Sequence, residues 1–130
     1  MSIRLISLAA AGLVAGCASL PQNEVGEVRT TQDGAFTAPQ AQRGKAVYEA
    51  DCLSCHPASF YEAQLGLWQG ATVDELFEAL SATMPAENPG SLPTSDYLDV
   101  LAYILSITGS PSGDAELTLE SMVSVTIVND

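Results

Sequence analysis

The stretch Cys52-Leu53-Ser54-Cys55-His56 decides the fold of this chain, because it places two thiols three residues apart and an imidazole directly after the second thiol. This Cys-x-x-Cys-His pattern is typical of covalent c-type haem attachment, in which the thiols add to the two haem vinyl groups. A bare Cys-x-x-Cys also occurs in thiol oxidoreductases and as half of a zinc site. The pentapeptide alone leaves these alternatives open.

The remaining cysteines and histidines favour haem. The chain has 3 cysteines and 1 histidine, so no second Cys-x-x-Cys completes a four-thiolate zinc site. A thioredoxin-like site would need strands alternating with helices, whereas the flanks predict helix, loop and helix. We expect one haem c, attached to Cys52 and Cys55, with His56 as an iron ligand. A haem-free thiol oxidoreductase and a metal site are the alternatives.

Three segments predict the helices of an all-α domain over residues 40–108. The first, 41–50, leads directly into Cys52. The second opens at Thr72 with carboxylates in its first turn and ends near Thr83. The third opens at Thr94 or Ser95, carries apolar residues at i, i+3, i+4 and i+7, and stops at Gly109. About seventy residues form only a marginal core, so we expect the haem to act as a covalent staple.

The order of these helices around the haem motif resembles the small class I (monohaem) cytochromes c. The resemblance covers residues 40–108 and implies a cytochrome c-like fold, with three main helices around a covalently bound haem and the first helix crossing the last. Gly44 would let these two helices approach closely, and Tyr48 would meet Tyr97 or Leu101.

The same resemblance implies the sixth iron ligand. Met84 follows the second predicted helix, where the family carries its axial methionine. Such a thioether favours the ferrous state and raises the reduction potential. Once Met1 is removed with the signal, Met122 is the other thioether. Trp68 would either donate its indole N–H to a haem propionate or pack in the core.

Residues 1–16 predict a cleaved signal peptide. Arg4 precedes an apolar run from Leu5 to Val14 that is too short to span a membrane. The run ends in Val14-Ala15-Gly16-Cys17, which resembles the lipobox of bacterial lipoproteins and implies lipidation of Cys17. An ordinary secretory signal is the alternative. The resemblance implies anchorage on the periplasmic side of a bacterial membrane, and Ala18, where inner-membrane lipoproteins carry Asp, favours the outer membrane.

Two further segments flank the predicted domain. Residues 17–39 are interrupted by Pro and Gly and predict a flexible leash after the lipidated cysteine. Residues 109–130 approach the alternation of a strand and predict a strand-like C-terminal extension. An isolated strand is unstable, so this extension would pair with the leash, another copy or a partner, or stay disordered.

The charge is strongly negative, at −12 formally for the whole chain. Removal of residues 1–16 takes away Arg4 and leaves 3 basic against 16 acidic residues, a formal −13. Nucleic acid and anionic lipid would repel such a protein, whereas a basic surface on an exported redox partner would attract it. The alternative is that the acidity serves solubility alone.

Together these features predict a membrane-anchored, periplasmic, monohaem cytochrome c that carries single electrons between redox partners and has no substrate chemistry of its own. It would serve as the cytochrome partner or subunit of an enzyme such as a dehydrogenase or reductase. The alternatives are a haem peroxidase or gas sensor with a displaceable sixth ligand, and the haem-free thiol oxidoreductase.

Overall fold

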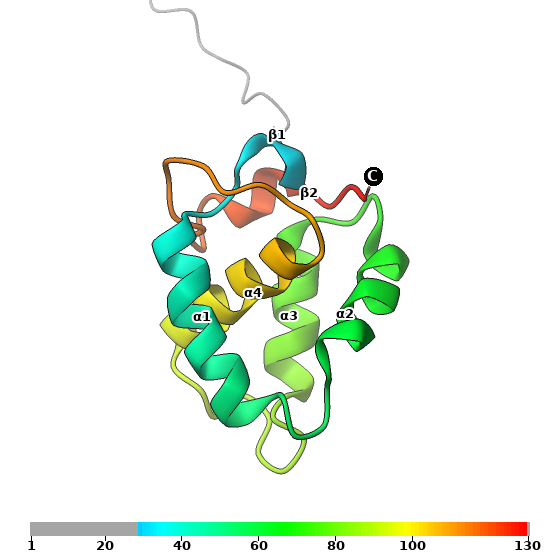
Figure 1. The fold of residues 1–130 in the computed structure, drawn as a ribbon, viewed down its shortest axis with the longest axis vertical. Coiled ribbons are helices and arrows are strands. Elements are labelled where there is room, and N and C mark those ends of the chain that lie inside the picture. Colours follow the sequence, from blue (N-terminus) through cyan, green and yellow to red (C-terminus); the bar gives the residue numbers. More distant parts are fainter. Residues whose placement is uncertain (1–28, 130) are drawn as a thin grey trace, which may run out of the picture.

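The computed structural model describes residues 29–129, so the predicted signal peptide, Cys17 and residues 18–28 lie outside the described part of the chain. Within it are α1 (Ala38–Asp51), α2 (Ala58–Leu65), α3 (Val73–Thr83) and α4 (Thr94–Ile107). Two short strands, β1 (Arg29–Thr30) and β2 (Val125–Thr126), and 3-10 turns at Thr31–Asp33, Gly66–Trp68 and Met122–Ser124 complete the fold (Figure 1). The predicted all-α class is confirmed. None of the helices in residues 29–129 is both long and apolar enough to cross a membrane.

The three predicted helices are present as α1, α3 and α4. Thr72 opens α3 as predicted, because its hydroxyl accepts the Glu75 N–H at 3.3 Å while the Glu75 carboxylate accepts the Thr72 N–H at 2.8 Å. Such a capping box satisfies two amides that the helix leaves unpaired. The helix α2 was not predicted, because Pro57 supplies no side-chain cap and only Tyr61 and Leu65 are buried on it.

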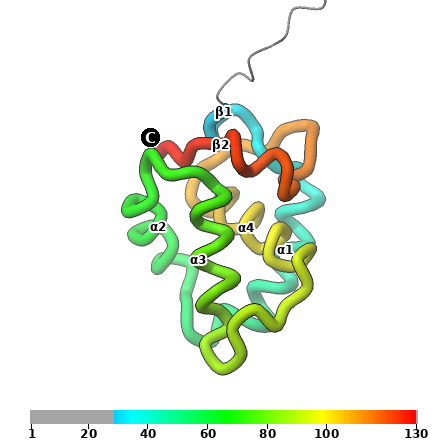
Figure 2. The backbone as a smooth tube through the Cα atoms, turned by 180° about the vertical axis from the view of Figure 1, so that it is seen from behind, coloured from blue at the N-terminus to red at the C-terminus, as the bar shows by residue number. Residues whose placement is uncertain are grey.

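The helices α1 and α4 pack against each other (Figures 1 and 2). Their closest approach is at Gly44, as expected. A Cβ added at Gly44 would lie 1.7 Å from the Asp99 carbonyl oxygen, so the two backbones touch where no side chain fits. Beside this contact the Arg43 guanidinium donates two hydrogen bonds to the Asp99 carboxylate, from Nε to Oδ2 at 2.7 Å and from Nη2 to Oδ1 at 3.0 Å. The crossing is therefore fixed by a steric contact and a bidentate ion pair.

Tyr48 belongs to another buried cluster than Leu101, and Tyr97 is not among the ring contacts that the structure shows for it, so the expected contact is wrong. Its ring lies against Tyr103, with centroids 5.1 Å apart, and edge-on to Tyr61 at 6.0 Å. The crossing point explains the difference, because Tyr48 lies one turn after Gly44 and Tyr103 lies one turn after Asp99.

The prediction of a flexible leash is wrong for residues 29–39. Strand β1 pairs in parallel with β2, with Arg29 opposite Val125, and Phe36 is 1% exposed in the main core. The segment has no apolar period because it buries single side chains rather than one face of a helix or strand. A short strand and single buried side chains docked on the domain describe this segment instead.

The C-terminal extension packs on the same core. Only Val125 and Thr126 form a strand, although Leu117, Met122, Val125 and Ile127 are buried. The buried Gln40 amide donates to the Leu117 carbonyl at 2.9 Å and accepts the Leu117 N–H at 2.7 Å, so a side chain takes the place of a neighbouring strand. The packed unit thus extends beyond residues 40–108 on both sides.

We predict that Gly44→Ala lowers the free energy of unfolding by about 3 kcal/mol or more, because the new methyl group overlaps a backbone atom that cannot rotate away. The matched control is Gly66→Ala, since a Cβ there meets nothing within 4 Å. At Gly66, where φ is −58°, alanine should leave stability unchanged or raise it by about 0.4–1 kcal/mol. Urea unfolding of the purified variants measures both changes, and equal midpoints would contradict the close crossing.

Candidate functional site

A cavity of about 410 Å³ opens between the end of α1, the helices α2, α3 and α4, and the loop after α3. All four of the sequence-predicted cofactor residues line it: Cys52, Cys55, His56 and Met84. Most of its wall is apolar and comes from Phe60, Tyr61, Leu65, Leu76, Leu80, Val100, Leu101 and Ile104. The fold therefore brings two thiols, an imidazole and a thioether to one apolar cavity.

The haem motif is coiled back on the end of α1. The N–H groups of Cys52 and Leu53 both donate to the Tyr48 carbonyl, at 3.0 and 2.8 Å. The N–H groups of Cys55 and His56 then donate to the Cys52 carbonyl, at 3.1 and 2.9 Å. This turn is what lets both thiols, three residues apart, reach the same cavity.

The phenol of Tyr48 holds the end of this turn through a hydrogen bond. It is buried and donates to the His56 carbonyl at 2.6 Å. Burial is the main cause that raises the pKa of Tyr48, so the phenol stays protonated and remains a donor. The His56 ring itself lies against Phe60, with centroids 4.5 Å apart.

Met84 reaches the cavity from the end of α3. Its N–H makes the last helical hydrogen bond, to the Leu80 carbonyl at 2.9 Å. Its own carbonyl accepts the Tyr97 hydroxyl at 2.6 Å and the Gly90 N–H at 3.3 Å. Met122, by contrast, is 3% exposed in the main core and does not line this cavity. Of these two thioethers, only Met84 is available to a group bound there.

The Cys52 thiol does not have the environment of a redox-active cysteine. Burial, and next the negative charge of Asp51, raise the pKa of the Cys52 thiol. Reactive dithiols need the opposite shift, because the thiolate is the nucleophile. The site therefore disfavours the thiol oxidoreductase alternative.

Helix α2 supplies cavity residues that the sequence reasoning missed. Phe60, Tyr61 and Leu65 line the cavity, and Tyr61 and Leu65 are buried. The i, i+4 spacing of these last two residues was the available signal. Trp68 lines the cavity and packs, partly buried, against the main core, as the second of its two expected positions required. Its contact with a haem propionate stays a prediction.

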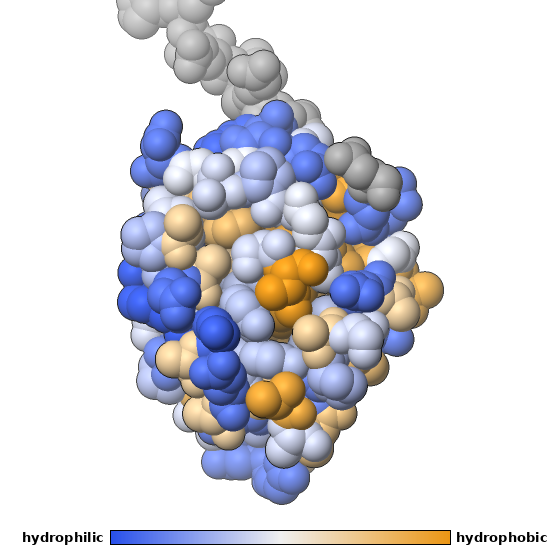
Figure 3. All heavy atoms as spheres, viewed as in Figure 1, coloured by the Kyte–Doolittle hydropathy of each residue, from blue (hydrophilic) through white to orange (hydrophobic). Residues whose placement is uncertain are grey.

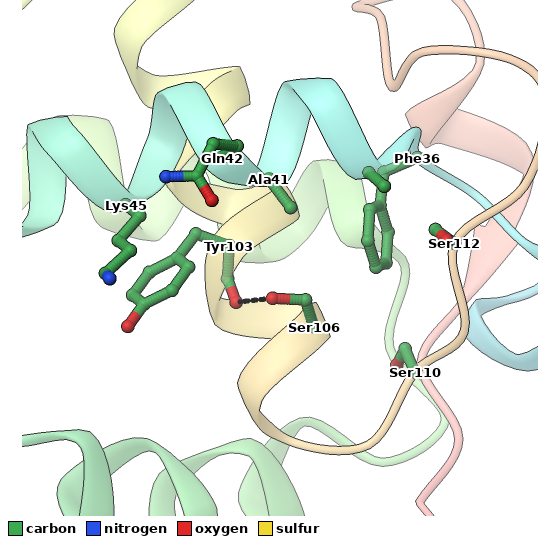
Figure 4. Close-up of a pocket in the computed structure, with 9 residues that line it drawn as sticks. Phe36, Ala41, Gln42, Lys45, Tyr103, Ser106, Ser110 and Ser112 are labelled. Atoms are coloured by element: carbon green, nitrogen blue, oxygen red, sulfur yellow. Dashed lines mark hydrogen bonds between the residues drawn. The ribbon is translucent and has the colours of Figure 1, made fainter.

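A separate hollow of about 330 Å³ lies between α1 and the end of α4 (Figure 4). Lys45, Tyr103 and Ser106 line it, and the Ser106 hydroxyl donates to the Tyr103 carbonyl at 2.7 Å. None of the predicted site residues lines this hollow.

The larger cavity suits a haem on the chemistry of its donors. Two thiols provide the attachment points, while an imidazole and a thioether are iron ligands of the c-type cytochromes. Its volume lies within the roughly 300–1,000 Å³ of typical cofactor pockets, and its apolar wall suits a large apolar macrocycle. Asp51 and Glu87 are the charged residues of the lining, and no Lys or Arg is among them.

Comparison with protein families gives one match, and comparison with curated proteins and with solved structures gives none. The family model described as cytochrome c oxidase, cbb3-type, subunit III matches residues 39–104, which is half of the chain and includes Cys52, Cys55, His56 and Met84. The chain therefore belongs to this cytochrome c family, which implies haem c and a general role in haem-based electron transfer.

Proposed function

We propose that the chain is a monohaem cytochrome c that carries one electron at a time between exported redox proteins. In this proposal Cys52 and Cys55 would hold the haem covalently, and His56 and Met84 would ligate its iron. The observation that carries the proposal is the shared cavity, because side chains from the end of α1 and the end of α3 line the same apolar space. A single haem follows from the single Cys-x-x-Cys-His motif in the sequence.

The residues of the cavity have distinct tasks. The apolar wall from Leu65, Leu80 and Leu101 excludes water and lowers the local dielectric constant. A Met84 thioether favours the ferrous state and raises the reduction potential. The bound haem would supply the one-electron Fe(III)/Fe(II) chemistry, and no substrate reaction is required of the chain.

The alternative of a haem peroxidase or gas sensor assigns a different role to one residue, Met84. It would require Met84 to leave the iron readily, so that peroxide or a gas could bind there. The two hydrogen bonds to the Met84 carbonyl favour a held ligand and hence electron transfer.

The ligation is tested with Met84→Leu, which keeps the volume and removes the sulfur. We predict that the haem stays attached, that the reduction potential falls, and that the ferrous form binds carbon monoxide, because the thioether no longer closes the iron. Redox titration and absorption spectra with carbon monoxide measure these changes.

The matched control is Met122→Leu, a volume-conserving change in the main core that should alter neither property. Retained potential and closed iron in Met84→Leu would assign the sixth position to another group. Ready carbon monoxide binding by the unaltered protein would favour the gas-sensor alternative.

The distribution of charge supports a basic partner. Every Lys and Arg of the chain precedes residue 46. Arg43 is paired with Asp99 and Glu116, and Lys45 with Glu49 at 3.6 Å. Asp51 and Glu87, at the cavity, form no ion pair within residues 29–129. We therefore propose that the partner docks near the cavity through a basic surface.

Apolar contacts alone are the competing basis for docking. Leu53, Phe60 and Leu67 are exposed, and Leu67 is 78% exposed. The view in Figure 3 shows hydrophobic residues at the surface in separate places, with more hydrophilic residues between them. Docking at such a mixed surface would be sensitive to charge, which salt can test.

We predict that the bimolecular electron-transfer rate with a basic redox protein falls about tenfold or more between 0.01 and 0.1 M salt, over which the Debye length shrinks from about 30 to about 10 Å. The double variant Asp51→Asn/Glu87→Gln should weaken this dependence. Asp114→Asn/Glu120→Gln, which removes the same charge from the C-terminal extension, should affect it less. Stopped-flow rates that do not change with salt would make the acidity a device for solubility.

The anchor remains a proposal from the sequence. We infer lipidation at Cys17 and location on the periplasmic side of a bacterial membrane, with the outer membrane favoured by Ala18. Two or more acyl chains hold a protein to a membrane durably. The described domain begins at Arg29, so the intervening chain limits its distance from Cys17 to about 40 Å at full extension.

We predict that Cys17→Ser moves the protein from the membrane fraction to the soluble periplasmic fraction, because the lipid chains are the proposed hold. Fractionation with immunodetection of both forms measures the distribution, and density separation of inner and outer membranes tests the sorting. Cys17→Ser remaining with membranes as fully as the parent would rule out a lipid anchor at this residue.

A further inference from the structure

Two buried tyrosines hold the backbones of the two proposed axial ligands. Tyr48 of α1 donates its hydroxyl to the His56 carbonyl, and Tyr97 of α4 donates its hydroxyl to the Met84 carbonyl, each at 2.6 Å. Both tyrosines are 3% exposed. Each ligand is thus connected by one short hydrogen bond to one of the two helices that cross at Gly44.

The contact at Met84 is the more informative of the two. Met84 is the cap residue directly after α3, so its carbonyl has no helical partner. Of its two donors, the Gly90 N–H belongs to the same loop, at 3.3 Å, whereas the Tyr97 hydroxyl comes from another helix. Tyr97 is therefore the tie shown between the Met84 carbonyl and the rigid helix pair.

The position of Tyr97 is itself well determined. Its ring is buried in the first turn of α4 and lies edge-on to Phe77 of α3, with centroids 6.2 Å apart. The hydroxyl consequently has little freedom to follow a moving loop. A displacement of Met84 would break the hydrogen bond rather than carry the tyrosine with it.

A methionine ligand depends on such a tie. Its side chain is unbranched and rotates about three bonds, so the side chain alone does not fix where the sulfur lies. The backbone position limits which rotamers reach the cavity. His56 depends less on its backbone hydrogen bond, because its ring lies against Phe60 and the adjacent thiols are the attachment points of the haem.

We propose that Tyr97 is a positioning residue for the sixth ligand. Its hydrogen bond to the Met84 carbonyl keeps the thioether directed into the cavity and so sets how often the iron opens to an added ligand. The inference rests on the proposed function, specifically on Met84 ligation.

The experiment compares three Tyr→Phe variants of the haem-loaded protein, with carbon monoxide as the probe of an open ferrous iron. Tyr97→Phe should raise the apparent association constant for carbon monoxide about fivefold, which corresponds to one net hydrogen bond. Its reduction potential should fall as the thioether is lost for part of the time.

The control for lost stability is Tyr48→Phe, which removes an equally short buried hydrogen bond on the other ligand. It should lower the unfolding midpoint about as much as Tyr97→Phe does but change carbon monoxide binding less than twofold. The second control, Tyr103→Phe, removes a phenol of α4 that lines the separate hollow of Figure 4 and lies outside the lining of the haem cavity. It should change neither property.

Equal carbon monoxide binding in Tyr97→Phe and Tyr48→Phe would overturn the positioning role. If Tyr97→Phe does not accumulate with haem, Phe77→Leu replaces it, because it loosens the Tyr97 ring and keeps the hydroxyl. A rise of about twofold in the association constant for carbon monoxide would support the proposal, and no rise would overturn it.

Met84→Leu in the same assay separates Met84 ligation from the positioning role of Tyr97. If Met84→Leu leaves the iron closed, Met84 ligation fails. If it opens the iron while Tyr97→Phe does not, only the positioning role fails.

Discussion

The contact between Gly44 and the Asp99 carbonyl is the constraint on which the rest of the structure depends. It brings α1 and α4 together at backbone distance, and the ion pair of Arg43 with Asp99 lies directly beside it. Asp99, and next Glu116, raise the pKa of the Arg43 guanidinium, which remains charged in any case. Because Arg43 is half-exposed, this pair adds less free energy than its short distances suggest, and the steric fit of the glycine dominates.

The helix pair in turn organises the cofactor cavity. Tyr48 projects from α1 to the haem motif, and Tyr97 projects from α4 to the end of α3. The haem motif and Met84 are far apart in the sequence, and each is connected by a hydrogen bond to the pair of helices α1 and α4. A change in the crossing of α1 and α4 would therefore alter the spacing of His56 and Met84 together, because neither carbonyl has another tie to this pair among the hydrogen bonds that the structure shows.

The segments on both sides of the helical domain enlarge a hydrophobic core that would be only marginally stable on its own. Phe36 from the N-terminal side and Leu117 and Ile127 from the C-terminal side are almost fully buried. Burial of side chains of this size contributes about 1.5–3 kcal/mol each. The Phe36 and Ile127 carbonyls accept the N–H groups of Gly113 and Gly70, whereas the backbone groups of Leu117 and Val128 are met by the side chains of Gln40 and Thr31. The wall of the cavity thus rests on a core that does not depend on the haem motif alone.

The sequence by itself determined the features whose causes are local. Covalent haem attachment needs two thiols and a histidine close together in the chain, so the motif at Cys52 is visible without a structure. The helices α3 and α4 are predicted by a capping box and an apolar stripe, respectively, and these patterns are also local. Tertiary structure decided the helix α2, the docking of residues 29–39, and the tie from Tyr97 to Met84. The docking of residues 29–39, for example, uses a hydrogen bond between Thr31 and Val128, which are 97 positions apart. Such contacts leave no period in the sequence, because only the folded chain decides which side chain meets which carbonyl.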